Sequence, residues 1–115
     1  MKVLLIDDNS QARQMIKDYV LNADDEFFEC RDGSEALAAY AEFRPDWVLM
    51  DWNMRKINGL IATQNIIAQF PDAKILMVTN YDENDLRQAA EQAGITGYVK
   101  KEDLFELKQI LNGQK

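Results

Sequence analysis

The chain has 115 residues, 47% of them apolar, and its 20 acidic and 13 basic side chains give a net charge of −7. This length suits a single domain, and the apolar content excludes an intrinsically disordered chain. The sequence contains no histidine, which excludes histidine-based metal sites, histidine general bases and Ser-His-Asp triads. Any chemistry must therefore use carboxylates, lysines, hydroxyls or the one thiol.

Charge and hydropathy also predict the setting in which the chain works. An acidic surface argues against direct binding to nucleic acid, which needs clustered basic charge. No apolar run approaches the roughly 20 residues of a membrane span, so we expect no membrane insertion. Cys30 is the single cysteine, and a lone thiol without a signal peptide is typical of a reducing, cytoplasmic setting. We expect Cys30 itself to be a small buried hydrophobic residue.

In chain order, short apolar runs alternate with longer periodic segments. The runs predict strands over residues 3–6, 27–30, 47–50, 75–78 and 98–99. Apolar residues every three or four positions predict helices over residues 12–23, 36–43, 60–70, 86–93 and 104–111, and Ser10 is the predicted N-cap of the first helix. Five strand-then-helix units predict an α/β fold, in which a five-stranded parallel sheet is flanked by five helices in one domain spanning residues 1–115. The strand order 2-1-3-4-5 is taken from flavodoxin-like doubly wound folds and is not implied by the residues themselves.

Polar side chains follow four of the five predicted strands, at the point where each strand ends. They are Asp7 and Asp8 after the first strand, Asp51 after the third, Thr79 after the fourth, and Lys100 and Lys101 after the fifth. The carboxyl ends of parallel strands share one edge of the sheet, and ligands of such folds bind there. We therefore expect the three aspartates to meet in one crevice, with Thr79 and a lysine on its other side.

Three carboxylates in one crevice repel one another and raise the pKa of at least one of them. A hard divalent cation resolves this conflict, and Mg²⁺ prefers oxygen ligands of this kind. An aspartate beside Mg²⁺ is also a nucleophile toward phosphorus, with a lysine to neutralise charge on the phosphoryl oxygens. The alternative is that Asp7, Asp8, Asp51 and Thr79 merely cap the helices that follow them.

At these positions the sequence resembles the receiver domain of bacterial two-component response regulators, and in particular chemotaxis-regulator-like receivers. The resemblance covers the chain from Val3 to about Leu111 and rests on several motifs in order. They are Leu5-Ile6-Asp7-Asp8-Asn9, Leu49-Met50-Asp51-Trp52-Asn53-Met54, Asn58-Gly59, Met77-Val78-Thr79-Asn80 and Ala93-Gly94-Ile95-Thr96-Gly97-Tyr98-Val99-Lys100-Lys101.

The resemblance implies a phosphoacceptor site with bound Mg²⁺. Asp51 would be the phosphoacceptor. Asp8 and Asp51 would bind Mg²⁺ through their side chains and Asn53 through its backbone carbonyl, while Asp7 would act on a metal-bound water. Trp52 is expected to pack locally, and its fluorescence should report on the adjoining site.

The resemblance also implies a switch. Thr79 would be the switch hydroxyl and Tyr98 the switch aromatic, which would move inward on phosphorylation. The family's lysine lies three residues after that aromatic, which selects Lys101 over Lys100. Simple packing is the alternative for Tyr98.

Two residues depart from the family pattern, which usually has proline at both positions. Arg55 follows Asn53-Met54, and Glu102 follows the lysine. Neither takes part in the expected chemistry, so they affect the expected loop geometry and not the ability to accept a phosphoryl group.

The implied function is a signalling module rather than an enzyme. A histidine kinase or a histidine phosphotransfer protein would supply the phosphoryl group. The face formed by the fourth helix, fifth strand and fifth helix would then change its preference for a downstream effector protein or domain, or for a second copy in a phosphorylation-dependent homodimer. Hydrolysis of the phosphoryl group is expected to take minutes or longer, because Asn80 and Tyr81 flank the path of the attacking water.

Three alternatives stay open on the sequence alone. The chain could be the receiver portion of a longer DNA-binding transcriptional regulator, because its tail after Leu111 resembles that of receivers followed by such a domain. It could be an interaction scaffold that is not phosphorylated. A small hydrolase with an aspartyl-phosphate intermediate is the third, although Asn53 replaces the second aspartate of the usual Asp-x-Asp pair.

Overall fold

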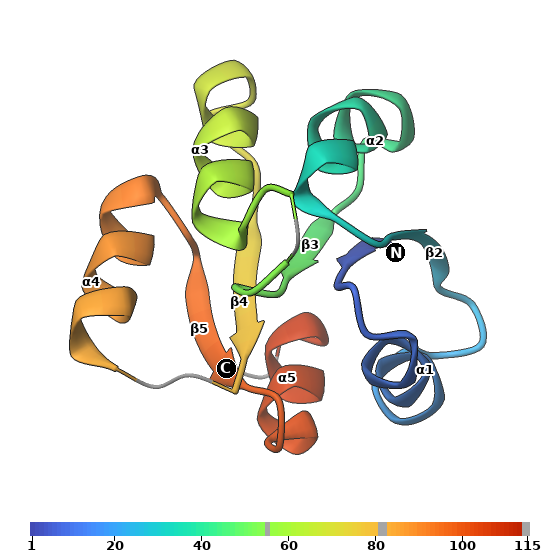
Figure 1. Ribbon diagram of the computed structural model, residues 1–115. Coiled ribbons are helices and arrows are strands. Elements are labelled where there is room, and N and C mark those ends of the chain that lie inside the picture. Colours follow the sequence, from blue (N-terminus) through green and yellow to red (C-terminus); the bar gives the residue numbers. More distant parts are fainter. Residues whose placement is uncertain (55, 81–82, 114–115) are drawn as a thin grey trace.

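A five-stranded parallel sheet forms the centre of the computed structural model, which describes residues 1–54, 56–80 and 83–113 (Figure 1). Its strands lie in the order β2-β1-β3-β4-β5, and all four neighbouring pairs are parallel. The strands are β1 (Lys2–Ile6), β2 (Glu26–Cys30), β3 (Trp47–Met50), β4 (Ile75–Thr79) and β5 (Gly97–Lys100). The predicted α/β class and strand order are confirmed.

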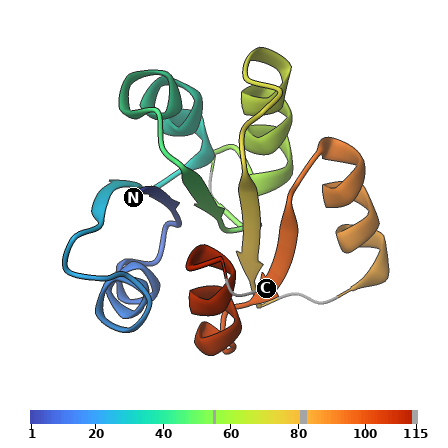
Figure 2. The same cartoon turned by 180° about the vertical axis from the view of Figure 1, so that it is seen from behind.

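Five α-helices cover the two faces of this sheet. They are α1 (Ser10–Tyr19), α2 (Ala36–Phe43), α3 (Gly59–Gln69), α4 (Asn84–Ala93) and α5 (Leu104–Leu111), with a short 3₁₀ turn at Gly33–Glu35 before α2. Helices α2, α3 and α4 lie on one face, and α1 and α5 lie side by side on the other (Figures 1 and 2). None of the described helices is long and apolar enough to cross a membrane.

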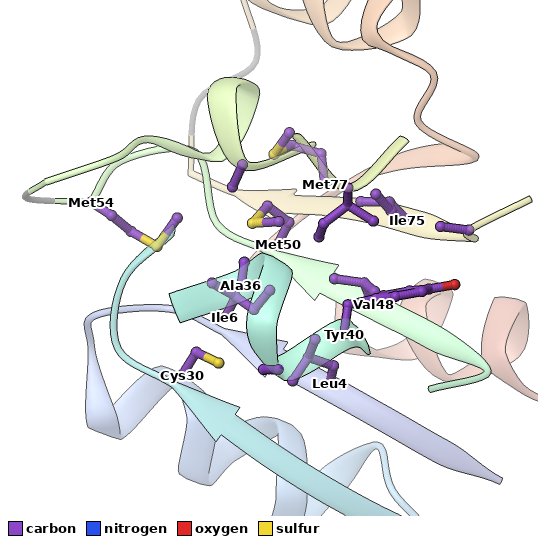
Figure 3. Close-up of a cluster of buried hydrophobic side chains, with 14 of the residues drawn as sticks. Leu4, Ile6, Cys30, Ala36, Tyr40, Val48, Met50, Met54, Ile75 and Met77 are labelled. Carbon is purple, nitrogen blue, oxygen red and sulfur yellow. The ribbon is translucent and has the colours of Figure 1, made fainter. Parts of the chain in front are cut away.

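Alternate side chains of the central strands feed two separate cores, because successive residues of a strand point to opposite faces. On the face under α2 and α3, Leu4, Met50 and Met77 pack toward Tyr40 (Figure 3). The opposite core contains apolar residues of β1, β3, β4 and β5. Helices α1 and α5 cover it with Ile16, Val20, Leu107 and Leu111. The inner strands β1, β3 and β4 are thus buried on both faces, whereas the edge strand β2 leaves Phe27 and Phe28 about half exposed. At the inner strands, only the ends are free to carry polar chemistry.

The cysteine behaves as the sequence predicts. Cys30 is 1% exposed at the end of β2 and belongs to the α2–α3 core. Burial raises the pKa of its thiol to about 11. The thiol is therefore protonated at neutral pH and serves as packing.

The first helix differs from its prediction at both ends. Its N-cap is Asn9, whose side chain accepts hydrogen bonds from the amides of Gln11 and Ala12, so the prediction that Ser10 caps the helix is wrong. The helix ends at Tyr19 rather than at residue 23. The spacing of apolar residues places Met15, Ile16, Tyr19 and Val20 on the helix face predicted to be buried. Ile16 and Val20 do face the sheet, but Met15 and Tyr19 are 48% and 64% exposed.

Candidate functional site

Three aspartates meet at the carboxyl edge of the sheet, as predicted. Asp7 and Asp8 follow β1 and Asp51 follows β3, and one carboxylate oxygen from each lies within 4.8 Å of the others. The Asp51 amide donates to the carbonyl of Ile6 at 2.9 Å, so the neighbouring strands β1 and β3 set this spacing. Asp7 and Asp51 are each 5% exposed, whereas Asp8 is open to solvent.

These residues fit a small divalent cation. All three donors are carboxylate oxygens, and their spacing allows one ion to contact an oxygen of each. Mg²⁺ prefers such oxygen ligands and keeps several waters, for which the exposed side of Asp8 leaves room.

Lys101 closes the other side of the crevice. Its Nζ lies 2.8 Å from Asp7 Oδ2 and 3.3 Å from Asp51 Oδ1, and its amide donates to the carbonyl of Thr79 at 3.0 Å. Lys100, by contrast, is exposed at the end of β5. The structure therefore brings Lys101, and not Lys100, to the aspartates.

The electrostatics of the crevice show in two shifted pKa values. Burial, together with the charge of Asp7, raises the pKa of Asp51 to about 6, although Lys101 opposes the shift. Burial alone would lower the pKa of Lys101, but its hydrogen bond to Asp7 and the charges of Asp7 and Asp51 raise it overall. The lysine is thus a permanent cation beside an aspartate that titrates close to neutral pH.

The alternative that the aspartates are helix caps is wrong. The N-caps of α1 and α3 are Asn9 and Asn58, so none of the three aspartates caps the helix that follows it. Asp7 instead accepts a hydrogen bond from the Asn9 amide at 2.8 Å. Thr79 is not a cap either, since the N-cap of α4 is Glu83.

The two predicted switch residues lie on adjacent strands. Thr79 ends β4 and is fully buried, while Tyr98 in β5 is 8% exposed. The guanidinium of Arg87 in α4 lies 5.1 Å from the centroid of the Tyr98 ring. In this structure Tyr98 is therefore already buried, and any further movement of its ring starts from that position.

The loop after β3 carries the remaining predicted residues. Trp52 is half-buried beside Asp51, and Asn53 is exposed two residues after it. The amide of Gly59 donates to the carbonyl of Trp52 at 2.8 Å. A Cβ at Gly59 would collide with the Asp51 carbonyl, so glycine lets α3 begin directly against the residue that follows β3.

Two predictions fall on residues that the structure does not describe, and one falls on a described turn. Arg55 and Tyr81 lie outside the described residues. Glu102 is exposed in the turn between β5 and α5, and the described part of the chain contains no cis peptide bond.

Sequence reasoning missed two buried charged residues beside the site. Asp32 accepts hydrogen bonds from the amides of Ser34, Lys56 and Ile57 at 2.9–3.1 Å, which ties the loop after β3 to the loop after β2. These donors lower the pKa of Asp32 to about 2 despite its burial. The Asp32-Gly33 pair is a turn signal that could have indicated this role.

Arg13 is the second missed residue. It lies in α1 and is 8% exposed. Its Nε donates to Glu29 Oε1 at 2.8 Å, and its Nη1 donates to the Asp7 carbonyl. A charged residue at one turn of an amphipathic helix carries no distinctive sequence signal, so only the structure reveals it.

A hollow of about 280 Å³ lies beside Lys101, between α1 and the start of α5. Asn9, Val78, Asn80 and Lys101 are among its lining residues.

Comparisons with known proteins agree with this geometry. A family model described as the response regulator receiver domain matches residues 3–112. The uncharacterized transcriptional regulatory protein YhcZ of Bacillus subtilis is 33% identical over 99% of this chain and 56% of its own length. The chain spans about half the length of the curated relatives it matches, since it covers 44% and 49% of the length of two further relatives.

Solved structures show the same fold. A LuxR-family two-component response regulator from Aurantimonas has a TM-score of 0.90 and 30% identity, covering 97% of this chain and 82% of its own. The Vibrio cholerae chemotaxis protein CheY4 has a TM-score of 0.88 and 29% identity, covering 99% of this chain and 98% of its own.

Proposed function

The chain belongs to the response regulator receiver domain family, and on that premise we propose that it accepts a phosphoryl group on Asp51 with the help of Mg²⁺. The observation that carries the proposal is the convergence of Asp7, Asp8, Asp51 and Lys101 on one crevice. We include in the proposal that residues 1–115 form one receiver domain that works in the cytoplasm.

Asp51 is the proposed nucleophile. A carboxylate oxygen of Asp51 attacks the phosphorus of a phosphohistidine, so that an O–P bond forms while the P–N bond breaks and its electron pair stays on the imidazole nitrogen. Lys101, which already lies 3.3 Å from Asp51 Oδ1, is placed to pair with a phosphoryl oxygen.

The proposed ligands of Mg²⁺ are the side chains of Asp8 and Asp51 and the backbone carbonyl of Asn53, with Asp7 acting through a bound water. When bound, the ion neutralises charge on the phosphoryl oxygens. Asp7 also holds Lys101 at 2.8 Å, which keeps the lysine at the edge of the site while the acceptor oxygen reacts.

The proposed switch runs from Thr79 to Tyr98. The buried hydroxyl of Thr79 would donate to a phosphoryl oxygen on Asp51, and the Tyr98 ring would shift against Arg87 as β4 and α4 adjust. This changes the face formed by α4, β5 and α5. A downstream effector protein or domain, or a second copy of the chain, would recognise the altered face.

The proposed donor is a histidine kinase or a histidine phosphotransfer protein. A DNA-binding output is favoured as the second candidate, because the relatives named as transcriptional regulators are about twice as long as this chain. In that case the receiver segment itself makes no contact with nucleic acid, in keeping with its net charge of −7.

Loss of the phosphoryl group should be slow. Hydrolysis by a second carboxylate would need an acid two residues after Asp51, and the chain has Asn53 there. The module thus catalyses its own phosphorylation and slow dephosphorylation only, with a phosphoryl lifetime of minutes or longer. A rapid burst of phosphate release would contradict this.

Incubation with acetyl phosphate and Mg²⁺ tests the proposal. We expect intact-mass spectrometry to show the gain of one phosphoryl group, which Asp51→Asn abolishes and Asp72→Asn, at an exposed aspartate after α3, does not. Failure of the wild-type chain to gain the group, or a gain that survives Asp51→Asn, would contradict it. A Trp52 fluorescence signal that does not respond to Mg²⁺ would instead favour the scaffold.

A further inference from the structure

Arg13 is a buried cation that the proposed phosphoryl chemistry does not use. Its side chain is 10% exposed, on the side of α1 that faces the end of the sheet. Removing a guanidinium from water is costly unless its donors are satisfied. Two of them are, by Glu29 of β2 and by the carbonyl of Asp7.

Both the main chain and the side chain of Asp7 are held by hydrogen bonds from several directions. Its amide donates to the Cys30 carbonyl at 3.0 Å, its carbonyl accepts from Arg13, and its Oδ1 accepts from the Asn9 amide at 2.8 Å. Strand β2, helix α1 and the turn between β1 and α1 thus converge on one residue of the proposed metal site.

The carbonyl that Arg13 binds belongs to the peptide joining Asp7 to Asp8. Because a peptide unit is planar, fixing this carbonyl also fixes the direction in which Asp8 leaves the sheet. Asp8 is exposed and packs against no core, so its direction depends on that peptide.

We propose that Arg13 is a positioning residue, which holds the Asp7–Asp8 peptide so that both carboxylates face the Mg²⁺ position before the ion arrives. This inference rests on the proposed function. It assigns to α1 a part in building the metal site through a bond to the main chain, with no contact to the ion.

The shape of the guanidinium, and not its charge alone, is what this role needs. Nε and Nη1 of Arg13 bond Glu29 and the Asp7 carbonyl at the same time, and a planar fork provides both directions at once. A lysine at position 13 keeps the charge but has a single nitrogen at the end of a flexible stem, so it cannot span the two acceptors in this way.

Glu29 holds the other end of the fork. It accepts from Arg13 at 2.8 Å and from Lys17 at 3.0 Å. Lys17 therefore provides a matched control, because it shares the acceptor and the helix of Arg13, while its own ion pair is with Glu29 and not with Asp7. Its replacement removes a cation of the same ion pair network and leaves the bond to the Asp7 carbonyl in place.

The test compares Arg13→Lys with Lys17→Gln by two measurements. In metal-free protein, hydrogen exchange of the Asn9 amide, which is bonded to Asp7, reports the order of the turn. Titration with Mg²⁺, followed by Trp52 fluorescence in a Trp47→Phe background, reports metal affinity. We expect Arg13→Lys to speed Asn9 exchange selectively and to weaken Mg²⁺ binding by about 10- to 100-fold, the usual cost of losing a group that orients a ligand. Lys17→Gln should leave both unchanged.

If Arg13→Lys does not fold, Glu29→Ala is the second variant. We expect it to speed Asn9 exchange and to weaken Mg²⁺ binding as well, but by less than Arg13→Lys. Wild-type exchange and Mg²⁺ affinity in Arg13→Lys would overturn the proposal, because charge alone would then suffice. So would faster exchange at every amide with unchanged Mg²⁺ affinity, which indicates a purely structural role. A wild-type chain that binds no Mg²⁺ would contradict the proposed function, whereas Asn9 exchange would still show whether Arg13 orders the turn.

Discussion

The two buried carboxylates of the crevice, Asp7 and Asp51, are equally exposed but held in different ways. Asp7 accepts from the Asn9 amide and from Lys101, both at 2.8 Å, and its carbonyl is bound by Arg13. Asp51 meets Lys101 at the longer distance of 3.3 Å. The difference agrees with the proposed chemistry, in which Asp7 shapes the site and an oxygen of Asp51 reacts.

Asp32, just beyond the crevice, extends this comparison. Three backbone amides lower its pKa to about 2, whereas burial beside Asp7 raises the pKa of Asp51 to about 6. Both carboxylates are buried, so the sign of the shift depends on whether the neighbours are donors or other acids. The fold stabilises the charged form of Asp32, whereas the pKa of Asp51 stays raised even with Lys101 at 3.3 Å.

The largest expected effect comes from removing the cation that Asp7 and Asp51 share. Lys101→Met should slow phosphoryl acceptance from acetyl phosphate by about 100- to 1000-fold, the usual cost of losing one group that stabilises developing charge. Lys100→Met is the matched control and should react like the wild type, because Lys100 is exposed at the end of β5. Initial rates from intact-mass spectrometry provide the comparison.

The same pair of variants distinguishes catalysis from metal binding. Lys101 and Mg²⁺ are both cations that pair with Asp51, so Lys101→Met should bind Mg²⁺ at least as tightly as the wild type. Weaker binding of Mg²⁺ by this variant would show that Lys101 holds the acids in place, and the distinction drawn between Asp7 and Asp51 would fail.

Of the two acids Asp32 and Asp51, we expect Asp32 to be the one whose replacement destabilises the fold. Asp32→Ala leaves three backbone amides without their acceptor and should lower the free energy of unfolding by about 2–3 kcal/mol at neutral pH. Because the pKa of Asp32 is lower in the folded chain than its ordinary value of 3.8, its contribution is fully present above pH 4 and is lost as the pH falls through about 2.

Urea unfolding at several pH values checks this prediction. The difference between wild type and Asp32→Ala should shrink as the pH approaches 2. A difference that is the same at pH 7 and pH 2 would mean that the lost side chain, and not its charge, explains the effect.

Asp51 should behave in the opposite way in metal-free buffer. Its folded pKa is raised from 3.8 to about 6, so its contribution to stability is fully present below pH 4 and is lost as the pH rises through about 6. The side chain of Asp51→Asn does not ionise, so this loss of stability does not occur in the variant. Its free energy of unfolding at pH 7–8 should therefore exceed that of the wild type by about 1–3 kcal/mol.

Mg²⁺ provides the control for this prediction. Saturating Mg²⁺ should stabilise the wild type by about 3 kcal/mol at a hundredfold excess over its dissociation constant, and should stabilise Asp51→Asn less. Equal stability of the two metal-free proteins at pH 8 would show that Asp51 is not electrostatically strained.

The residues alone predicted the α/β class, the succession of strands and helices and the polar residues at strand ends, whereas the strand order had to be taken from doubly wound folds. Buried apolar runs predict the strands to within one or two residues, and topology then brings Asp7, Asp8 and Asp51 together without any side-chain detail. Choosing Lys101 over Lys100 needed the family resemblance, since both follow the same strand.

What the sequence could not provide depends on the rotation of a helix and on the path of a loop. A periodic apolar pattern predicts that one face of a helix is buried but not how the helix is rotated, so Tyr19 was placed inside and Arg13 was overlooked. The Asp32-Gly33 pair could have indicated the local bond to the Ser34 amide, but Asp32 also binds amides 24 and 25 residues away along the chain, which a local pattern does not indicate.

The smallest expected effect tests the turn that joins Asp7 to α1. Asn9 has two separate parts in it, because its amide donates to Asp7 while its side chain caps the helix. Asn9→Ala removes only the cap and should cost about 1 kcal/mol in the free energy of unfolding. Ser10→Ala, one position along, should change it by less than about 0.5 kcal/mol, since Ser10 is already inside the helix.

Mg²⁺ affinity should be unchanged in both variants, because the Asn9 amide and the bond from Arg13 to the Asp7 carbonyl remain. A loss of Mg²⁺ affinity in Asn9→Ala as large as that in Arg13→Lys would mean that the helix start, rather than the buried guanidinium, orients the two aspartates.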